Sequence, residues 1–253
     1  MAWRRWWKAL LGLGLTLTGG CRESARLPIP PPADEVVNAA GDPRPPRRYA
    51  ALGASDTHGG GCRRPEQGYV PQLLRRLAAA GGTWELYNLG RDGVLIDHLV
   101  KHQLPAAIAV SPDVVTIWTG GNDVIKGGSP EAFAAALDHL LSELQARTRA
   151  VIVLGNLPEM DRQPFARRKS ARQRRRLRER SAAFNAAVES VAARHGIAVA
   201  DLRSGSLMYD PAHFSRDGVH PNEAGYAGIT ERFWAALQSQ RRDFGPEAPA
   251  SPR

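Results

Sequence analysis

The chain has 253 residues and a formal net charge of +9, with 43% hydrophobic and 23% charged residues. This composition is typical of a globular protein, and the two cysteines exclude a framework of several disulfides. The charge is uneven: the first 21 residues contribute +3 and residues 162–180 contribute +9, so the remainder carries −3. The sequence therefore predicts a mildly acidic domain with one very basic segment, and it excludes a generally basic protein.

The first 21 residues have the features of an export leader. Basic residues precede an apolar stretch that ends at Leu17, and Thr-Gly-Gly then leads to Cys21. Small residues before a cysteine resemble a bacterial lipobox, although Thr18 stands where leucine is usual. We expect Cys21 to be lipidated and the protein to be exported and anchored in a bacterial cell envelope. Ordinary secretion and an uncleaved anchor remain alternatives, but the apolar run is short for a bilayer.

The rest of the chain divides into three parts. Residues 22–47 are rich in proline, which predicts an extended tether. Residues 48–240 form the predicted domain, and residues 241–253 are a Pro/Ala-rich tail that we expect to be disordered. If Cys21 carries a lipid, Cys62 has no disulfide partner; otherwise the two cysteines could pair in an oxidising compartment.

Strand and helix patterns alternate through the domain. Short apolar runs predict strands over residues 49–52, 84–89, 114–118, 150–154 and 197–202. Helical spacing of apolar residues predicts helices over 69–80, 96–109 with a break near Pro105, 130–147, 168–195 and 223–238. Five strands separated by helices predict an α/β fold with a parallel sheet covered on both faces. Functional groups of such sheets gather beyond the carboxyl ends of the strands.

Ser55 directly follows the first predicted strand. A serine at this place can expose its hydroxyl and its backbone N–H together, as a nucleophile requires. The motif Gly-Ala-Ser-Asp lacks the second glycine of the Gly-x-Ser-x-Gly elbow. An ordinary helix N-cap is the alternative interpretation.

Asp217 and His220 lie three residues apart in Asp-Gly-Val-His-Pro-Asn. In a turn, such an aspartate can reach one ring nitrogen of the histidine and leave the other nitrogen free as a general base. The alternative is a helix-capping turn that carries a surface histidine.

Two further strand ends offer hydrogen-bond donors. Asn122 lies in Gly-Gly-Asn-Asp after one strand, and Gly90 follows Asn-Leu after another. An asparagine amide and an unobstructed backbone N–H can both stabilise an oxyanion.

The four motifs, in this order, resemble those of the SGNH (GDSL-like) hydrolase family, whose conserved blocks supply Ser, Gly, Asn and His. The resemblance covers residues 49–237, and it implies a flavodoxin-like, three-layer α/β/α fold with a five-stranded parallel sheet. It also implies a triad of Ser55, Asp217 and His220, an oxyanion hole formed by Ser55, Gly90 and Asn122, and no metal or other cofactor. The family usually has aspartate before the serine, whereas this chain has Ala54, which leaves the substrate less certain.

The remaining histidines support weaker interpretations. His213 could join Asp217 and His220 in a metal site, but the spacing is loose and no second acidic cluster accompanies it. His58, three residues after Ser55, could line the pocket. A supporting role behind the reacting groups or a position in solvent is the preferred interpretation over catalysis.

The basic segment supports two hypotheses. In one, it is a solvated helix face whose apolar residues pack inward. In the other, it lies beside the active site and contacts an anionic phospholipid or glycan surface. Candidate contacts for the second hypothesis are Arg167, Arg168, Arg172, Arg174 and Arg175. Nucleic acid is a poor partner because no aromatic platform accompanies the arginines.

The sequence thus predicts a monomeric, membrane-tethered hydrolase of carboxylic esters, with an ester of a lipid or an acylated glycan as substrate. The same residues would also serve an O-acetyl esterase or an acyltransferase that acts on cell-envelope glycans. A non-catalytic envelope-binding lipoprotein that uses the arginine-rich helix is the alternative from another class.

Overall fold

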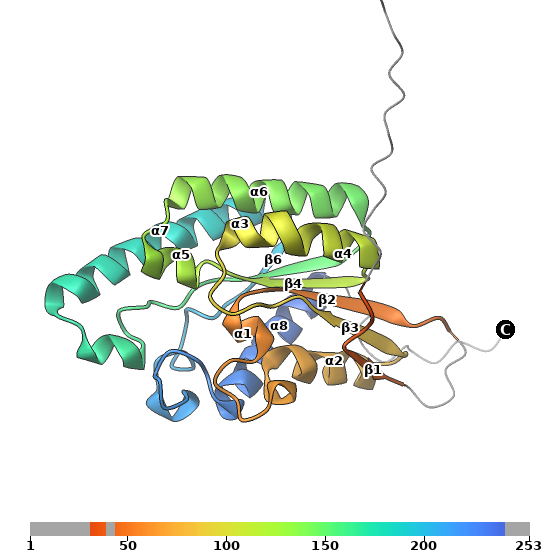
Figure 1. The fold of residues 1–253 in the computed structure, drawn as a ribbon, viewed down its shortest axis with the longest axis horizontal. Coiled ribbons are helices and arrows are strands. Elements are labelled where there is room, and N and C mark those ends of the chain that lie inside the picture. Colours follow the sequence, from red (N-terminus) through yellow and green to blue (C-terminus); the bar gives the residue numbers. More distant parts are fainter. Residues whose placement is uncertain (1–30, 39–43, 241–253) are drawn as a thin grey trace, which may run out of the picture.

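The computed structural model describes residues 31–38 and 44–240, and its centre is a six-stranded sheet (Figure 1). The strand order is β1-β3-β2-β4-β5-β6, with β2 to β6 parallel to their neighbours and β1 antiparallel to β3. The strands span Glu35–Val37 (β1), Arg47–Gly53 (β2), Trp84–Asn88 (β3), Val114–Trp118 (β4), Val151–Gly155 (β5) and Ala198–Ala200 (β6). The predicted parallel α/β fold is therefore confirmed. The leader, Cys21 and the tail lie outside the described residues.

The sheet has one more strand than the five that the sequence predicted. This strand, β1, lies inside the range predicted as a tether, and its Glu35 pairs with Leu86 of β3. Asp34 extends the pairing, because its carboxylate accepts a hydrogen bond from the N–H of Asn88 (2.6 Å). Three residues among prolines give little signal in the sequence, but their pairing covers an edge strand that would otherwise expose unpaired backbone groups.

Helices cover both faces of the sheet. One face carries α2 (Tyr69–Ala79) and α8 (Glu223–Gln240), and their aromatic rings stack, with Tyr69 and Phe233 centred 4.9 Å apart. The opposite face carries α4 (Leu104–Val110), α6 (Pro130–Arg147) and α7 (Ala171–His195), as Figure 1 shows. Two separate apolar cores result, one on each side of the sheet. None of the described helices combines the length and low polarity needed to cross a lipid bilayer.

The helix predicted over residues 96–109 is split into three pieces. α3 (Ile96–His98) continues into a π-helical turn, η2 (Leu99–Gln103), and α4 then begins with Pro105 in its first turn. Proline has no N–H to donate and its ring clashes with the carbonyl four residues earlier, so the regular helix cannot run through it. The wider turn places Gln103 in the protein interior, where it contacts the end of β2.

Short segments follow the carboxyl ends of the strands. α1 (Ser55–His58) follows β2, and α5 (Gly121–Lys126) follows β4. The remaining short helical turns are η1 (Pro65–Gln67), η3 (Pro164–Arg168) and η4 (Pro211–His213). The segments that contain Ser55, Asn122 and His220 therefore meet at this edge of the sheet.

Candidate active site

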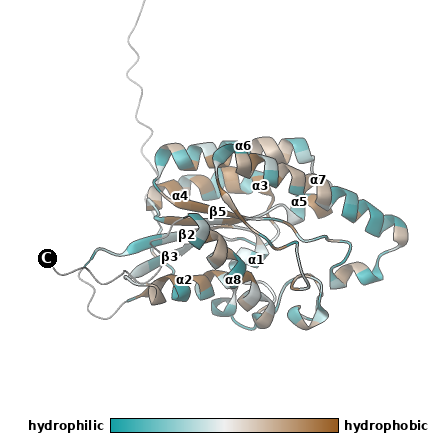
Figure 2. Ribbon diagram, turned by 180° about the vertical axis from the view of Figure 1, so that it is seen from behind, coloured by the Kyte–Doolittle hydropathy of each residue, from teal (hydrophilic) through white to brown (hydrophobic). Residues whose placement is uncertain are grey.

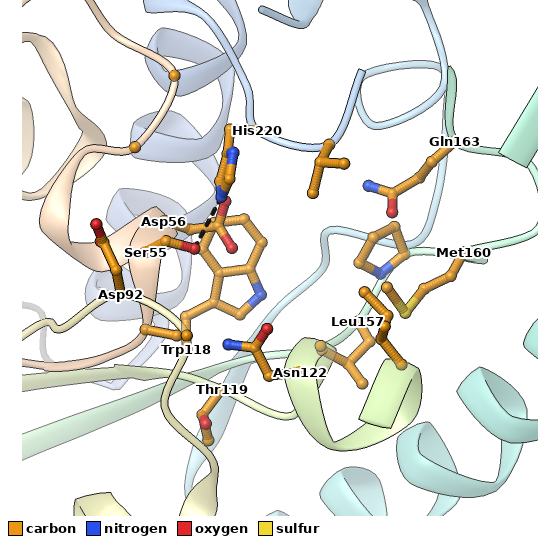
Figure 3. Close-up of a pocket in the computed structure, with 18 of the residues that line it drawn as sticks. Ser55, Asp56, Asp92, Trp118, Thr119, Asn122, Leu157, Met160, Gln163 and His220 are labelled. Atoms are coloured by element: carbon orange, nitrogen blue, oxygen red, sulfur yellow. Dashed lines mark hydrogen bonds between the residues drawn. The ribbon is translucent and has the colours of Figure 1, made fainter. Parts of the chain in front are cut away.

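The fold brings Ser55 to His220, 165 residues further along the chain. The Oγ atom of Ser55 lies 2.9 Å from Nε2 of His220 (Figure 3). On the other side of the ring, Nδ1 lies 2.7 Å from Oδ2 of Asp217. A carboxylate can only accept, so Nδ1–H donates to Asp217 and Nε2 is left to accept the proton of the Ser55 hydroxyl.

The turn that carries Asp217 and His220 is held by hydrogen bonds to the second carboxylate oxygen. Oδ1 of Asp217 accepts from the backbone N–H groups of Val219 (2.8 Å) and His220 (2.9 Å), and from the Ser215 hydroxyl (2.8 Å). Gly218 completes the turn with a φ of 68°, which residues with a Cβ rarely adopt. The local sequence thus sets the carboxylate and the imidazole at a fixed distance before any substrate binds.

The electrostatics of the pair match these contacts. Burial alone would raise the pKa of Asp217, but hydrogen bonds from His220, Val219 and Ser215 outweigh it and lower the pKa to about 2. Burial lowers the pKa of His220, but its hydrogen bond to Asp217 and the nearby carboxylates raise it above its ordinary value. The aspartate is therefore ionised at neutral pH, and it stabilises the imidazolium form of its neighbour.

Asp56, the residue after Ser55, adds a second carboxylate beside the imidazole. It lines the same cavity as Ser55 and His220. Burial raises the pKa of Asp56 to about 6, with His220 lowering it and Asp217 raising it further. Asp56 in turn is one of the carboxylates that raise the pKa of His220.

Asn122 is the second residue of α5 and lines the same cavity. Its amide nitrogen donates one hydrogen bond to the carbonyl of Val94 (3.0 Å), which fixes the side chain. An amide has two N–H groups, and Figure 3 shows the nitrogen directed toward the side of the cavity that holds Ser55. The structure thus places Asn122 where the sequence predicted it.

Gly90 does not reach the cavity that Ser55 lines. Its N–H donates to the side chain of Asn88 (3.1 Å), and a Cβ at this position would lie 2.6 Å from the backbone nitrogen of His58. Gly90 is therefore the point of close packing against α1. Gly93, three residues later, lines the cavity instead, with a φ of 71°. The sequence analysis named only Gly90, and the three-dimensional path of the loop brings Gly93 to the cavity in its place.

Two further side chains hold the backbone beside Ser55 and at the end of α5, and no pattern in the sequence indicates either role. Gln103 is buried, and its amide accepts from the N–H of Gly53 and donates to the carbonyl of Gly53, both at 2.9 Å. It thereby holds the end of β2 just before Ser55. Arg180 of α7 donates to three carbonyls at the end of α5: those of Val124 (2.7 Å), Asp123 (3.0 Å) and Gly128 (2.7 Å).

The cavity at this site has a volume of about 460 Å³. Its apolar side is formed mainly by Trp118, Ile125, Leu157, Met160, Met208 and Val219. The cavity is also lined by Gly60, Gly61, Asp92 and Gly93, of which Gly60 and Gly61 lie against His220. This size and this apolar lining with a few polar groups are typical of small-molecule sites.

The other predicted residues lie outside this cavity. Nδ1 of His58 contacts Asp92 (3.0 Å), and Nδ1 of His213 contacts the carbonyl of Leu207 (3.1 Å). Arg167, Arg168, Arg172, Arg174 and Arg175 are exposed on η3 and the first turns of α7. Cys62 is half-buried and carries a free thiol, whose pKa burial raises to about 11.

Comparison with known proteins finds the same fold in solved structures. TesA shares the fold, with a TM-score of 0.62 and 22% identity over 77% of this chain and all of that structure. The acetylxylan esterase Axe2 from Geobacillus stearothermophilus gives a TM-score of 0.60 at 20% identity, over 76% of this chain and 94% of that structure. A 2,3-bisphosphoglycerate-independent phosphoglycerate mutase of Paracoccus denitrificans (strain Pd 1222) is 33% identical over 101 residues, 38% of this chain but only 19% of the mutase.

A family model matches far more of the chain. Residues 51–227, more than half of the 253, match the GDSL-like Lipase/Acylhydrolase family. The matched range contains Ser55, Asn122, Asp217 and His220. The chain belongs to the GDSL-like lipase/acylhydrolase family of carboxylic ester hydrolases, as the sequence predicted.

Proposed function

We propose that this protein hydrolyses carboxylic esters through an acyl-enzyme formed on Ser55. The observation that carries the proposal is the continuous hydrogen-bonded chain from Ser55 through His220 to Asp217, with distances of 2.9 and 2.7 Å. A hydroxyl, a base and an orienting carboxylate in this arrangement generate a nucleophile at neutral pH.

In the first half of the reaction, Oγ of Ser55 attacks the acyl carbonyl while its proton passes to Nε2 of His220. The tetrahedral oxyanion accepts hydrogen bonds from the amide of Asn122 and from the backbone N–H groups of Ser55 and Gly93, the residues of this cavity suited to that role. The bond to the leaving oxygen then breaks, and His220 donates the proton to the departing alcohol.

In the second half, water takes the place of the alcohol. His220 accepts a proton from the water as its oxygen attacks the acyl-enzyme, and the bond from the carbonyl to Oγ of Ser55 then breaks. The proton returns to Ser55, and the carboxylic acid leaves. Asp217 remains ionised throughout, because its pKa of about 2 lies far below neutral pH, and it stabilises the imidazolium of each step.

The lining of the cavity favours an acyl chain over an acetyl group. Its apolar side includes Ile125, Leu157, Met160 and Met208, which is more apolar surface than one methyl group covers. We therefore place an ester of an apolar acyl chain before an O-acetylated glycan as the substrate. A panel of nitrophenyl esters from acetate to palmitate tests this order, and we expect kcat/KM to rise beyond acetate.

Replacing Ser55 with alanine tests the mechanism. Ser55→Ala removes the nucleophile, so we expect ester hydrolysis to fall by about 10⁴-fold or more, with the fold unchanged. Ser215→Ala removes a serine hydroxyl that contacts Asp217 rather than the substrate, so it should lose far less activity. Activity retained in full by Ser55→Ala would exclude the proposed mechanism.

The location of the protein is a separate proposal. The leader pattern that ends at Cys21 supports a lipid-anchored protein of the bacterial envelope, tethered through the proline-rich segment. Incorporation of labelled palmitate that disappears in Cys21→Ser is the expected result. A protein that is released without a lipid would instead support ordinary secretion.

A further inference from the structure

Residues 167–176 form a projecting basic segment, which we name the basic arm. It contains six arginines and one lysine, with no acidic residue, and all ten of its residues are exposed. The first buried residue of α7 is Ser181. Leu177 already packs against the core, so the six helical residues before it, 171–176, extend about 9 Å beyond that contact at 1.5 Å per residue. Figure 2 shows this end of α7 as a hydrophilic projection beyond the sheet.

The charges of the basic arm are not used to hold the fold together. Within the described residues, Arg175 approaches Glu179 at 3.6 Å, whereas Arg167, Arg168, Arg172 and Arg176 contact no acidic side chain. In the turns that follow the basic arm, by contrast, the arginines have partners: Arg178 pairs with the buried Asp161 (2.8 Å), and Arg180 with the carbonyls of α5.

The position of these charges also opposes helix stability. The first turn of α7 contains no acidic residue, although the positive end of the helix dipole favours one there. A capping box between Ser170 and Gln173 starts the helix without any charge. Neither the fold nor the helix therefore accounts for this density of cations, which indicates a partner outside the domain.

The basic arm follows closely after residues that line the cavity. Met160 and Gln163 line the cavity, and η3 follows them immediately. The N–H of Phe165 in η3 donates to the carbonyl of Gly218 (2.9 Å), between Asp217 and His220. The basic arm is thus attached to the loop that carries the histidine.

Apolar side chains are exposed at the cavity that the basic arm adjoins. Among the described residues, the large hydrophobic side chains with high exposure are Val36, Ile125 (51%) and Val219 (36%). Ile125 and Val219 both line the cavity, and Ile125 belongs to α5, which packs against α7. Exposed apolar residues next to unpaired cations are typical of a surface that rests on a lipid interface.

We propose that the basic arm docks the domain on an anionic phospholipid surface, with Ile125 and Val219 in contact with the lipid, so that the cavity takes its acyl ester from that surface. This inference rests on the proposed function. Phosphate head groups complement the cations, and acyl chains complement the two apolar residues. An anionic glycan would leave Ile125 and Val219 without a partner, and nucleic acid would find no aromatic residue in the basic arm for stacking.

Vesicle binding tests the docking separately from catalysis. The full chain with Cys21→Ser and Ser55→Ala carries no lipid at residue 21 and consumes no ester, and it is sedimented with vesicles of phosphatidylcholine alone or mixed with phosphatidylglycerol. We expect binding to the anionic vesicles that weakens as salt rises. Adding Arg172→Gln and Arg176→Gln should weaken it about thirtyfold, because each basic residue near such a surface contributes a factor of about five.

A matched variant controls for net charge. Arg147→Gln with Arg149→Gln removes the same charge from the opposite edge of the sheet, where α6 ends and β5 begins, and it should bind vesicles like the parent chain. With Ser55 intact, the arm variant should lose hydrolysis of esters in anionic vesicles and keep kcat/KM for a short soluble ester.

Three results would overturn the inference. The first is equal binding to both kinds of vesicle, and the second is an equal loss of vesicle binding in the arm and control variants. The third is an arm variant that keeps vesicle binding but loses binding to heparin, which serves as an anionic glycan. The last would assign the basic arm to an anionic glycan. If Ser55→Ala still hydrolyses esters, the proposed function fails, while the vesicle measurement still reports on docking.

Discussion

At the scale of single residues, the site combines a fixed triad with an unusual neighbour. Ala54 stands before the nucleophile where the family usually has aspartate, and the carboxylate of Asp56 follows it instead. Asp56 lines the cavity, and its charge favours the protonated form of His220. A general base acts only when it is neutral, so this carboxylate influences the pH at which the enzyme becomes active.

Asp56→Asn should move the acidic limb of the kcat/KM profile to lower pH. Loss of a negative charge destabilises the imidazolium, so the pKa of His220 falls and the base becomes neutral at lower pH. Because the pKa of Asp56 is itself about 6, the acidic limb of the parent profile reflects the titration of Asp56 and His220 together. The measurement is a pH profile with a short soluble ester. Asp97→Asn, an exposed residue that does not act on His220, is the control, and a limb that stays in place or moves upward would contradict this role.

At the scale of elements, irregular segments carry the parts of the site that the sequence did not reveal. The π-helical turn η2 directs Gln103 into the protein, where it bonds both backbone groups of Gly53. Such turns break regular helices and are frequent near functional sites. The predicted break near Pro105 was correct, but its consequence for β2 depends on a contact 50 residues away.

Gln103→Leu should lower the free energy of unfolding by about 1–3 kcal/mol, because it leaves the buried N–H of Gly53 without a partner and removes one of the two donors to the Gly53 carbonyl, which still accepts from the N–H of Arg91. Urea denaturation measures this loss. Gln103→Glu can accept from the N–H and donate to the carbonyl of Gly53 only with its carboxyl protonated, so it should lose less stability than Gln103→Leu in that protonated form. Gln145→Leu alters an exposed glutamine and serves as the control. Equal stability of Gln103→Leu and Gln145→Leu would show that the hydrogen bonds between Gln103 and Gly53 do not stabilise β2.

Arg180→Gln should reduce kcat more than it changes KM. The guanidinium caps the end of α5, whose second residue is Asn122, so its loss frees the proposed oxyanion donor to move. We expect a stability loss of about 1–3 kcal/mol in addition. Steady-state kinetics with a soluble ester measures kcat and KM separately. Arg175→Gln on the same helix is exposed and should change neither quantity; similar kinetics for the two variants would exclude a positioning role for Arg180.

At the scale of the whole molecule, parallel topology explains why distant residues meet. Parallel strands end at the same edge, so serine, asparagine and histidine can be predicted to converge from their positions after strands and in the last loop. The same rule could not point to Gly93, because Gly90 follows β3 as well; in the structure the N–H of Gly90 donates to Asn88, whereas Gly93 lines the cavity. Nor could it reveal β1, whose three residues gain their structure by pairing with β3 rather than from their own pattern.

The charge distribution belongs to this scale as well. The sequence reveals the basic segment, and five of its arginines were predicted as surface contacts, but only the fold shows that the segment divides at Leu177. Arg178 and Arg180 have partners within the domain, and the residues before Leu177 are exposed. Helical periodicity cannot make this division, since it depends on where the body of the domain ends.

Labelling with a serine-directed phosphonate tests the central claim most directly, because it requires the nucleophile and its base to act together. Intact-mass measurement and peptide mapping should find one phosphonyl group, attached to Ser55, in the parent chain. His220→Ala should be labelled far more slowly, and Ser55→Ala should not be labelled at all. Labelling of Ser55→Ala at the parental rate, or attachment to any residue other than Ser55, would contradict the proposed triad.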